Sequence, residues 1–171
     1  MNEVIKHSIR FIILWAIQTL VLNQLDIGFG IQMMVYPLFI MLLPIDLGIF
    51  FVMILALALG AAIDSISDTY GLHTSSLLIV AYFRPIIFKM FAPRDGYENF
   101  REGNIYELGT RWFIYVYGLL LLIHHFWFFT LEIFRLDNIL FILIKTAISV
   151  PLSFILSLLL QTMLVSKPKE R

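Results

Sequence analysis

The sequence predicts an all-α membrane protein, a bundle of six membrane-spanning helices with both termini in the cytoplasm. Composition is the first reason: apolar residues make up 60% of the 171 residues, charged residues only 14%, and the mean hydropathy is +0.90. Such a chain is too apolar for a soluble domain of this length. The second reason is a series of uncharged segments of spanning length, and the third is the uneven placement of basic residues.

The apolar segments define the predicted spans. A helix crosses the hydrocarbon core of a bilayer with about 17–25 residues. The predicted spans are about 8–25, 29–44, 46–63, 71–91, 108–134 and 138–165. The first is an anchor rather than a cleaved signal peptide, because no small-x-small cleavage site follows it; Arg10 within it can snorkel to the interface. The loops are short, so residues 1–171 are expected to form a single polytopic domain without a soluble catalytic domain.

The basic residues predict the orientation. One side of the predicted bundle carries nine of them: Lys6, Arg10, Lys89, Arg94, Arg101, Arg111, Lys167, Lys169 and Arg171. The loops on the other side hold only Arg135. Positive charge accumulates on the cytoplasmic side of membrane proteins, so both termini are predicted to lie inside. The formal net charge is zero, and we expect membrane lipid but no nucleic acid among the partners.

The stretch GAAIDSISDTYGLH, from Gly60 to His73, is the most polar feature outside the cytoplasmic loops. Asp64 and Asp68 are four residues apart, and two carboxylates on one helix face can bind a metal or transfer protons. Ser67 and its neighbours are equally typical of a capped, hydrated turn, which is the interpretation we favour. Small residues before the turn let another helix approach closely. They are Ala56, Ala58, Gly60, Ala61 and Ala62.

Two basic residues fall within predicted spans. Arg84 lies in the inner half of the bilayer, where an unpaired charge is costly, so we expect it to be held by Asp46 or by polar groups inside the bundle. Pro85 follows it and should bend the helix. Lys145 is expected either to snorkel outward or to reach a carboxylate of the outer end. The candidates are Asp64, Asp68 and Glu132.

Signatures of catalysis are missing. The chain has no cysteine, no HExxH helix, no GxSxG elbow and no paired aspartate motif of alcohol phosphotransferases. His124 and His125 are adjacent and point about 100° apart on a helix, so they cannot both ligate one metal; at least one is expected to be a hydrogen-bonded interior histidine. We therefore expect that the protein is not an enzyme and that it binds no cofactor and no metal. The candidate structural or partner-binding residues are Asp46, Gly60, Asp64, Ser67, Asp68, Gly71, Arg84 and Pro85.

These residues resemble the rod shape-determining protein MreD family over nearly the whole chain. The resemblance is carried by a small-residue third span ending in Gly60-x-x-x-Asp64, a Ser/Asp turn, Gly71-Leu72-His73, and a fourth span closing on Arg84-Pro85. The segment Ala92-Pro93-Arg94-Asp95-Gly96-Tyr97-Glu98 also resembles one branch of that family. The order and spacing of these pieces together are hard to obtain by chance.

The resemblance implies the six-helix fold of the substrate-binding subunits of energy-coupling-factor vitamin transporters. It also implies a non-enzymatic subunit of the elongation machinery in the bacterial inner (cytoplasmic) membrane. The implied partner is the periplasmic scaffold MreC, and through it MreB, RodA and a class B penicillin-binding protein. The family gives Asp64 and Arg84-Pro85 no settled chemical role.

Two other functions stay open. The fold relation makes a vitamin-binding transporter subunit the main alternative, although such subunits present alanines at four-residue spacing in the first span. Here Phe11–Leu22 contains only Ala16 as a small residue. An intramembrane hydrolase or transferase would have to rely on Asp64, Asp68 and the histidine pair.

Overall fold

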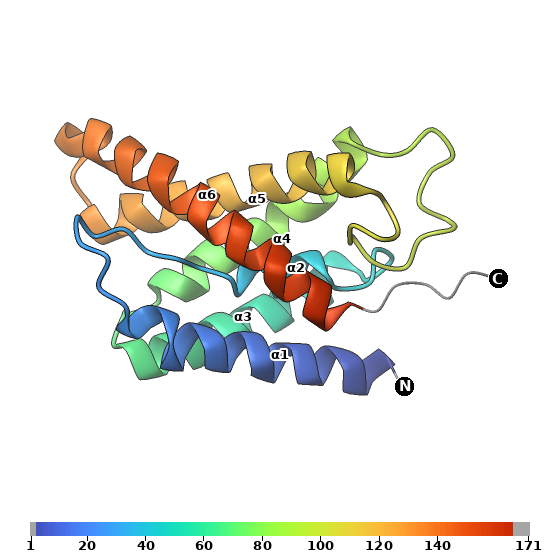
Figure 1. Cartoon of the computed structure of the whole chain (residues 1–171), viewed down its shortest axis with the longest axis horizontal. Coiled ribbons are helices and arrows are strands. Elements are labelled where there is room, and N and C mark those ends of the chain that lie inside the picture. The colour runs from blue at the N-terminus through green and yellow to red at the C-terminus, as the bar shows by residue number, and fades with distance from the viewer. Residues whose placement is uncertain (1–2, 166–171) are drawn as a thin grey trace.

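The structure is a computed structural model that describes residues 3–165 (Figure 1). Its elements are α1 (Glu3–Leu20), η1 (Leu22–Gln24), α2 (Pro37–Met41), α3 (Ile49–Ser67), α4 (Leu72–Met90), α5 (Thr110–Ile133), η2 (Leu136–Asn138) and α6 (Ile139–Leu164). Over these residues no β-strand forms, and one isolated bridge joins Pro44 to Glu102. The all-α prediction is confirmed.

Four helical segments are long and apolar enough to cross a membrane: Glu3–Gln24, α3, α5 and α6. Large apolar side chains lie on their outer surfaces; for example, Phe50, Leu140 and Met163 are more than two-thirds exposed. In water such a surface would be costly, whereas lipid tails cover it without penalty. The length and composition of these helices therefore indicate a membrane protein.

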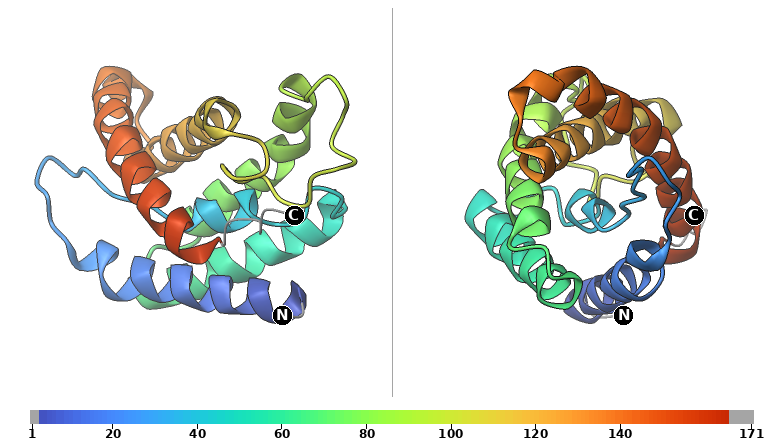
Figure 2. Two further views of the ribbon diagram at one scale, coloured as in Figure 1. Left: turned by 45° about the vertical axis from the view of Figure 1, so that its right-hand side comes forward. Right: turned by 90° about the vertical axis from the view of Figure 1, so that its left-hand side faces the viewer.

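The long helices form a ring. α1 packs on α3, α3 on α4, α4 on α5, and α5 on α6, as the view along the bundle shows (Figure 2, right). α2 lies inside this ring and contacts α1, α3, α4 and α5. α1 begins and α6 ends at the same end of the bundle (Figure 1). The predicted cytoplasmic residues Lys167, Lys169 and Arg171 lie outside the described residues.

The bounds of α3, α4, α5 and α6 agree with the predicted spans to within four residues, and α1 begins and ends five residues earlier than predicted. The predicted helix over 29–44 is wrong. Residues 31–36 are non-helical, α2 has only five residues, and residues 42–48 form turns and an isolated bridge. The segment passes through the centre of the ring, and residues 34–43 are all buried (Figure 2). Its apolar side chains are thus covered by protein, and apolar composition alone did not distinguish this central segment from a lipid-facing helix.

The backbone of this central segment is paired by side chains of the surrounding helices. Non-helical backbone at membrane depth is tolerated only where protein or water satisfies its polar groups. Gln18 accepts from the N–H of Val35 at 2.9 Å and donates to the carbonyl of Met33 at 3.1 Å. From α6, Ser149 accepts from the N–H of Gln32 at 3.2 Å, and Ser153 from the N–H of Met34 at 2.9 Å.

The α6 residues that face the centre follow a simple sequence pattern. Ser149, Ser153, Ser157 and Gln161 recur every four residues and are fully buried. Ser157 pairs with the hydroxyl of Tyr117 at 2.8 Å. Four-residue spacing places side chains on one helix face, so α6 presents a polar stripe to the centre of the bundle.

Candidate functional site

The polar turn between α3 and α4 is organised by Asp64. Its carboxylate accepts hydrogen bonds from the backbone N–H groups of His73 (3.0 Å) and Thr74 (2.9 Å), and from the hydroxyls of Thr69 and Thr74 (both 2.5 Å). The first backbone N–H groups of a helix lack intrahelical partners, and the residue preceding α4, Gly71, has no side chain to offer. Asp64 therefore caps α4 from the last turns of α3. The predicted capped turn is observed.

The other turn residues support the same hairpin. A Cβ atom on Gly60 would lie 2.4 Å from the Cα atom of Thr74, so glycine is required for the close approach of α3 and α4. Ser67 accepts a hydrogen bond from Asn23 at 2.7 Å, which links η1 to α3. Asp68 ends α3 in the left-handed conformation, with φ of 53°, and is exposed to solvent. The two aspartates thus have separate surroundings and separate roles.

Arg84 is buried and bound by carbonyl oxygens. Its Nη2 donates to the carbonyls of Leu43 at 2.6 Å and Pro44 at 3.0 Å, in the turn between α2 and α3. The expected ion pair with Asp46 does not form in the described structure: Asp46 is exposed, and backbone oxygens two and three residues earlier take its place. Of the two arrangements considered, polar groups inside the bundle hold Arg84. Pro85 lies within α4, which continues to Met90.

A second polar cluster, which the sequence analysis missed, lies where α1 begins and α6 ends. Glu102, from the loop between α4 and α5, is almost completely buried and accepts from Arg10 at 2.9 Å. Lys6 pairs with the same carboxylate oxygen at 2.6 Å. Arg10 also donates to the carbonyl of Leu164 at 3.1 Å. Arg10 therefore does not snorkel. Its position in an apolar segment was the signal in the sequence that a partner for its charge was needed.

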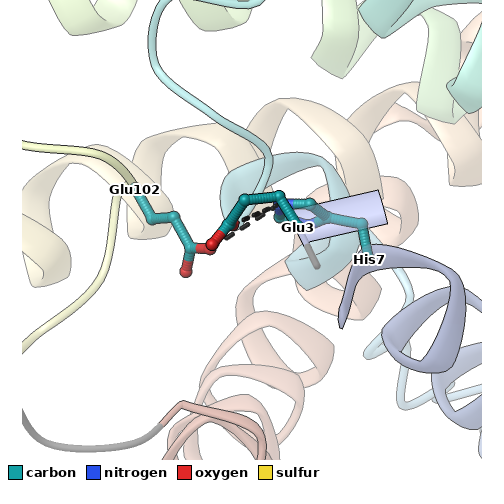
Figure 3. A group of neighbouring side chains, drawn as sticks. All are labelled: Glu3, His7 and Glu102. Atoms are coloured by element: carbon teal, nitrogen blue, oxygen red, sulfur yellow. Dashed lines mark ion pairs between the residues drawn. The ribbon is translucent and has the colours of Figure 1, made fainter. Parts of the chain in front are cut away.

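Glu3, His7 and Glu102 could ligate a metal by position alone (Figure 3). The Nε2 atom of His7 lies 3.8 Å from Glu3 and 3.7 Å from Glu102. Lys6, however, already pairs with both carboxylates, and Arg10 pairs with Glu102. A metal ion would have to displace the Lys6 ammonium and sit beside the Arg10 guanidinium. The cluster is better described as a charge-balanced clamp between α1 and the loop.

Histidines and a tyrosine form a hydrogen-bonded chain at the centre of the ring. The Tyr36 hydroxyl lies 2.9 Å from Nδ1 of His73 and 2.6 Å from Nε2 of His124. A phenol has one proton, so Tyr36 donates to one imidazole and accepts from the other. His125 pairs with Ser153 at 3.0 Å. The expectation of an interior hydrogen-bonded histidine is confirmed for both members of the pair.

Lys145 is held rather than extended to the interface. Its ammonium pairs with Glu132 at 2.5 Å and lies 4.4 Å from the ring centre of Phe129. Gln32 donates to the other carboxylate oxygen of Glu132 at 2.9 Å. Of the alternatives for Lys145, pairing with Glu132 is the one observed. This contact joins α5, α6 and the central segment.

Comparison of the chain with protein-family models, with curated protein sequences and with solved structures found no match.

Proposed function

We propose that this protein is a non-enzymatic scaffold subunit of the bacterial elongation machinery, of the kind that the MreD resemblance implies. One observation supports the proposal. Three buried residues of the resembling motif serve to join segments of the bundle: Gly60 allows close packing, Asp64 caps α4, and Arg84 binds the turn before α3. Residues with such structural roles are suited to a subunit that holds its partners together and catalyses no reaction.

The docking surface for an MreC-like partner is proposed to lie at the outer end of α3 and α4. A shallow cavity of about 370 Å³ opens there between the two helices. Asp68 is exposed beside it, and Tyr70 is fully exposed although aromatic side chains are usually covered. Tyrosines are enriched among residues that dominate binding energy at interfaces. Asp64 is excluded from direct docking, since its carboxylate is occupied by the cap.

Co-purification tests this function. Asp68→Asn combined with Tyr70→Ala should leave the protein inserted and abundant, yet lower the MreC-like protein retained in mild detergent by about tenfold, the effect of losing one central aromatic contact. Cells carrying the variant should become round. Asp137→Asn, in the loop between α5 and α6, is the matched control and should retain the partner. Full retention by the double variant together with normal rod shape would contradict the docking surface.

Membrane topology is a separate expectation of the same proposal. Reporter fusions at Arg101 and after Arg171 are expected to report cytoplasm, and a fusion at Asp68 to report periplasm, because basic residues gather on one side. In the structure, Arg101 and Asp68 belong to loops at opposite ends of the long helices (Figure 1). A cytoplasmic signal at Asp68 would invert the proposed orientation.

One observation favours the alternative function, a small-molecule binding subunit of an energy-coupling-factor type transporter. A cavity of about 530 Å³ lies at the outer end, within the size range of ligand pockets. Its lining includes Asn23, Ser67, His73, Phe128 and Glu132. Mass spectrometry of the purified protein separates the two functions: a vitamin-sized molecule, or co-purifying ATPase subunits, would favour the transporter, whereas retention of a periplasmic scaffold protein favours the proposal above.

A further inference from the structure

A groove between α3 and α4, at the end of the bundle where α1 begins, combines an apolar wall with two cations. Its volume is about 290 Å³. The apolar wall includes Leu47, Val52, Ala81 and Phe88, and the cations are Arg84 and Lys89. Arg84 is only 3% exposed, whereas Lys89 is exposed in the last turn of α4. A buried cation in such a place requires a source of negative charge.

The described residues supply only part of the hydrogen-bond acceptors and negative charge that the buried Arg84 guanidinium requires. Its Nη2 is paired with the two carbonyls, and its guanidinium lies 4.6 Å from the ring centre of Phe88, but in the described structure Nε makes no hydrogen bond. No carboxylate of the described residues forms an ion pair with Arg84; the exposed Asp46 acts on its charge only from a longer distance. Burial raises the pKa of Tyr97, which also lines the groove, so its hydroxyl stays neutral and donates to the Phe88 carbonyl at 2.7 Å.

We propose that this groove binds an anionic phospholipid, with its phosphate between Arg84 and Lys89 and an acyl chain along the apolar wall. The two residues are five apart on α4, which separates them by a rise of about 7.5 Å and a rotation of about 140°. Both nevertheless line the groove, and their long side chains can reach one phosphate from two sides. Basic pockets between helices near a membrane surface are suited to anionic headgroups, and α3, one wall of the groove, is long and apolar enough to cross a membrane. The proposal does not depend on the partner-binding role.

Native mass spectrometry of the full chain tests the site. The protein is equilibrated in micelles with equal amounts of phosphatidylglycerol and phosphatidylcholine of identical acyl chains. We expect phosphatidylglycerol adducts to exceed phosphatidylcholine adducts at least about fivefold, and Lys89→Gln to remove most of this preference, as the loss of one basic residue predicts. Arg111→Gln is the matched control: it removes another exposed basic residue near the same end, outside the groove.

The outcomes decide the proposal in both directions. Lys89→Gln is the main variant because Lys89 is exposed and forms no hydrogen bond or ion pair within residues 3–165, whereas Arg84→Gln also removes the hydrogen bonds to the turn before α3. Equal adducts of the two lipids on the unmodified protein would overturn the site, as would equal losses in Lys89→Gln and Arg111→Gln. Displacement of the lipid by excess inorganic phosphate would overturn the role of the apolar wall. Retention under those conditions supports it.

Discussion

Gly60→Ala is expected to lower the amount of folded protein in the membrane severely. The added methyl group would lie 2.4 Å from the Cα atom and 2.9 Å from the backbone nitrogen of Thr74, and backbone atoms cannot turn aside as a side chain can. Relief requires α3 and α4 to separate, which also pulls Asp64 away from the amides that it caps. Overpacking costs about 1–3 kcal/mol and a lost cap about 1 kcal/mol. Thermal unfolding in detergent, followed by size-exclusion chromatography, measures the loss.

Gly118→Ala is the matched control, because Gly118 is also a glycine inside a long helix. A Cβ atom there would meet no other atom within 4 Å. Alanine favours helix by about 1 kcal/mol over glycine, so this variant should be neutral or slightly more stable. The same substitution is thus expected to have opposite effects in α3 and α5. Equal behaviour of the two variants would mean that close packing at Gly60 is not required.

Glu102→Leu should destabilise the protein by about 3–5 kcal/mol, since removing one partner of a buried ion pair leaves the other charge uncompensated. Arg10 is 3% exposed and has no other carboxylate within pairing distance in the described structure. The loss should appear as early thermal unfolding and as proteolysis of the loop between α4 and α5, because Glu102 ties that loop to α1.

A double variant tests whether the stability lost in Glu102→Leu comes from the unpaired charge of Arg10 or from disruption of the loop between α4 and α5. Arg10→Met together with Glu102→Leu removes both buried charges and should recover part of the stability lost in Glu102→Leu. Asp137→Asn serves as the control, since its pair with Arg135 is about two-thirds exposed and contributes little. If the double variant were less stable than Glu102→Leu alone, Arg10 would not be the group that Glu102 compensates.

The helices with outward-facing apolar surfaces could be predicted from the sequence. α3, α5 and α6 each carry an uncharged run of spanning length, and their ends agree with the predicted spans 46–63, 108–134 and 138–165 to within a few residues. The segment 29–44 has the same composition but lies inside the ring. A high hydropathy indicates that a segment is more stable away from water, but it does not distinguish a segment covered by lipid from one covered by protein.

The candidate site was predictable where its residues are close in sequence. Asp64 and Thr74 are ten residues apart across a tight turn, so a cap between them could be anticipated. Glu102 and Arg10 are separated by 92 residues, and nothing local indicates that this carboxylate is buried. For Arg84 the need for a partner was predictable, whereas the partner was not, because any backbone carbonyl can serve and every residue carries one.

The central segment also constrains the order in which the chain can assemble. Residues 31–36 emerge from the ribosome well before α6, yet α6 supplies the hydroxyls that pair the amides of Gln32 and Met34. Until α6 has packed, these amides must stay hydrogen-bonded to water or to another acceptor, because it is costly to bury an unpaired N–H group in hydrocarbon. α1 and α3 can insert first, whereas the amides at the centre of the protein are paired only after α6 has been synthesised. The helix that follows all the others in the described residues, α6, is therefore the one that completes the core.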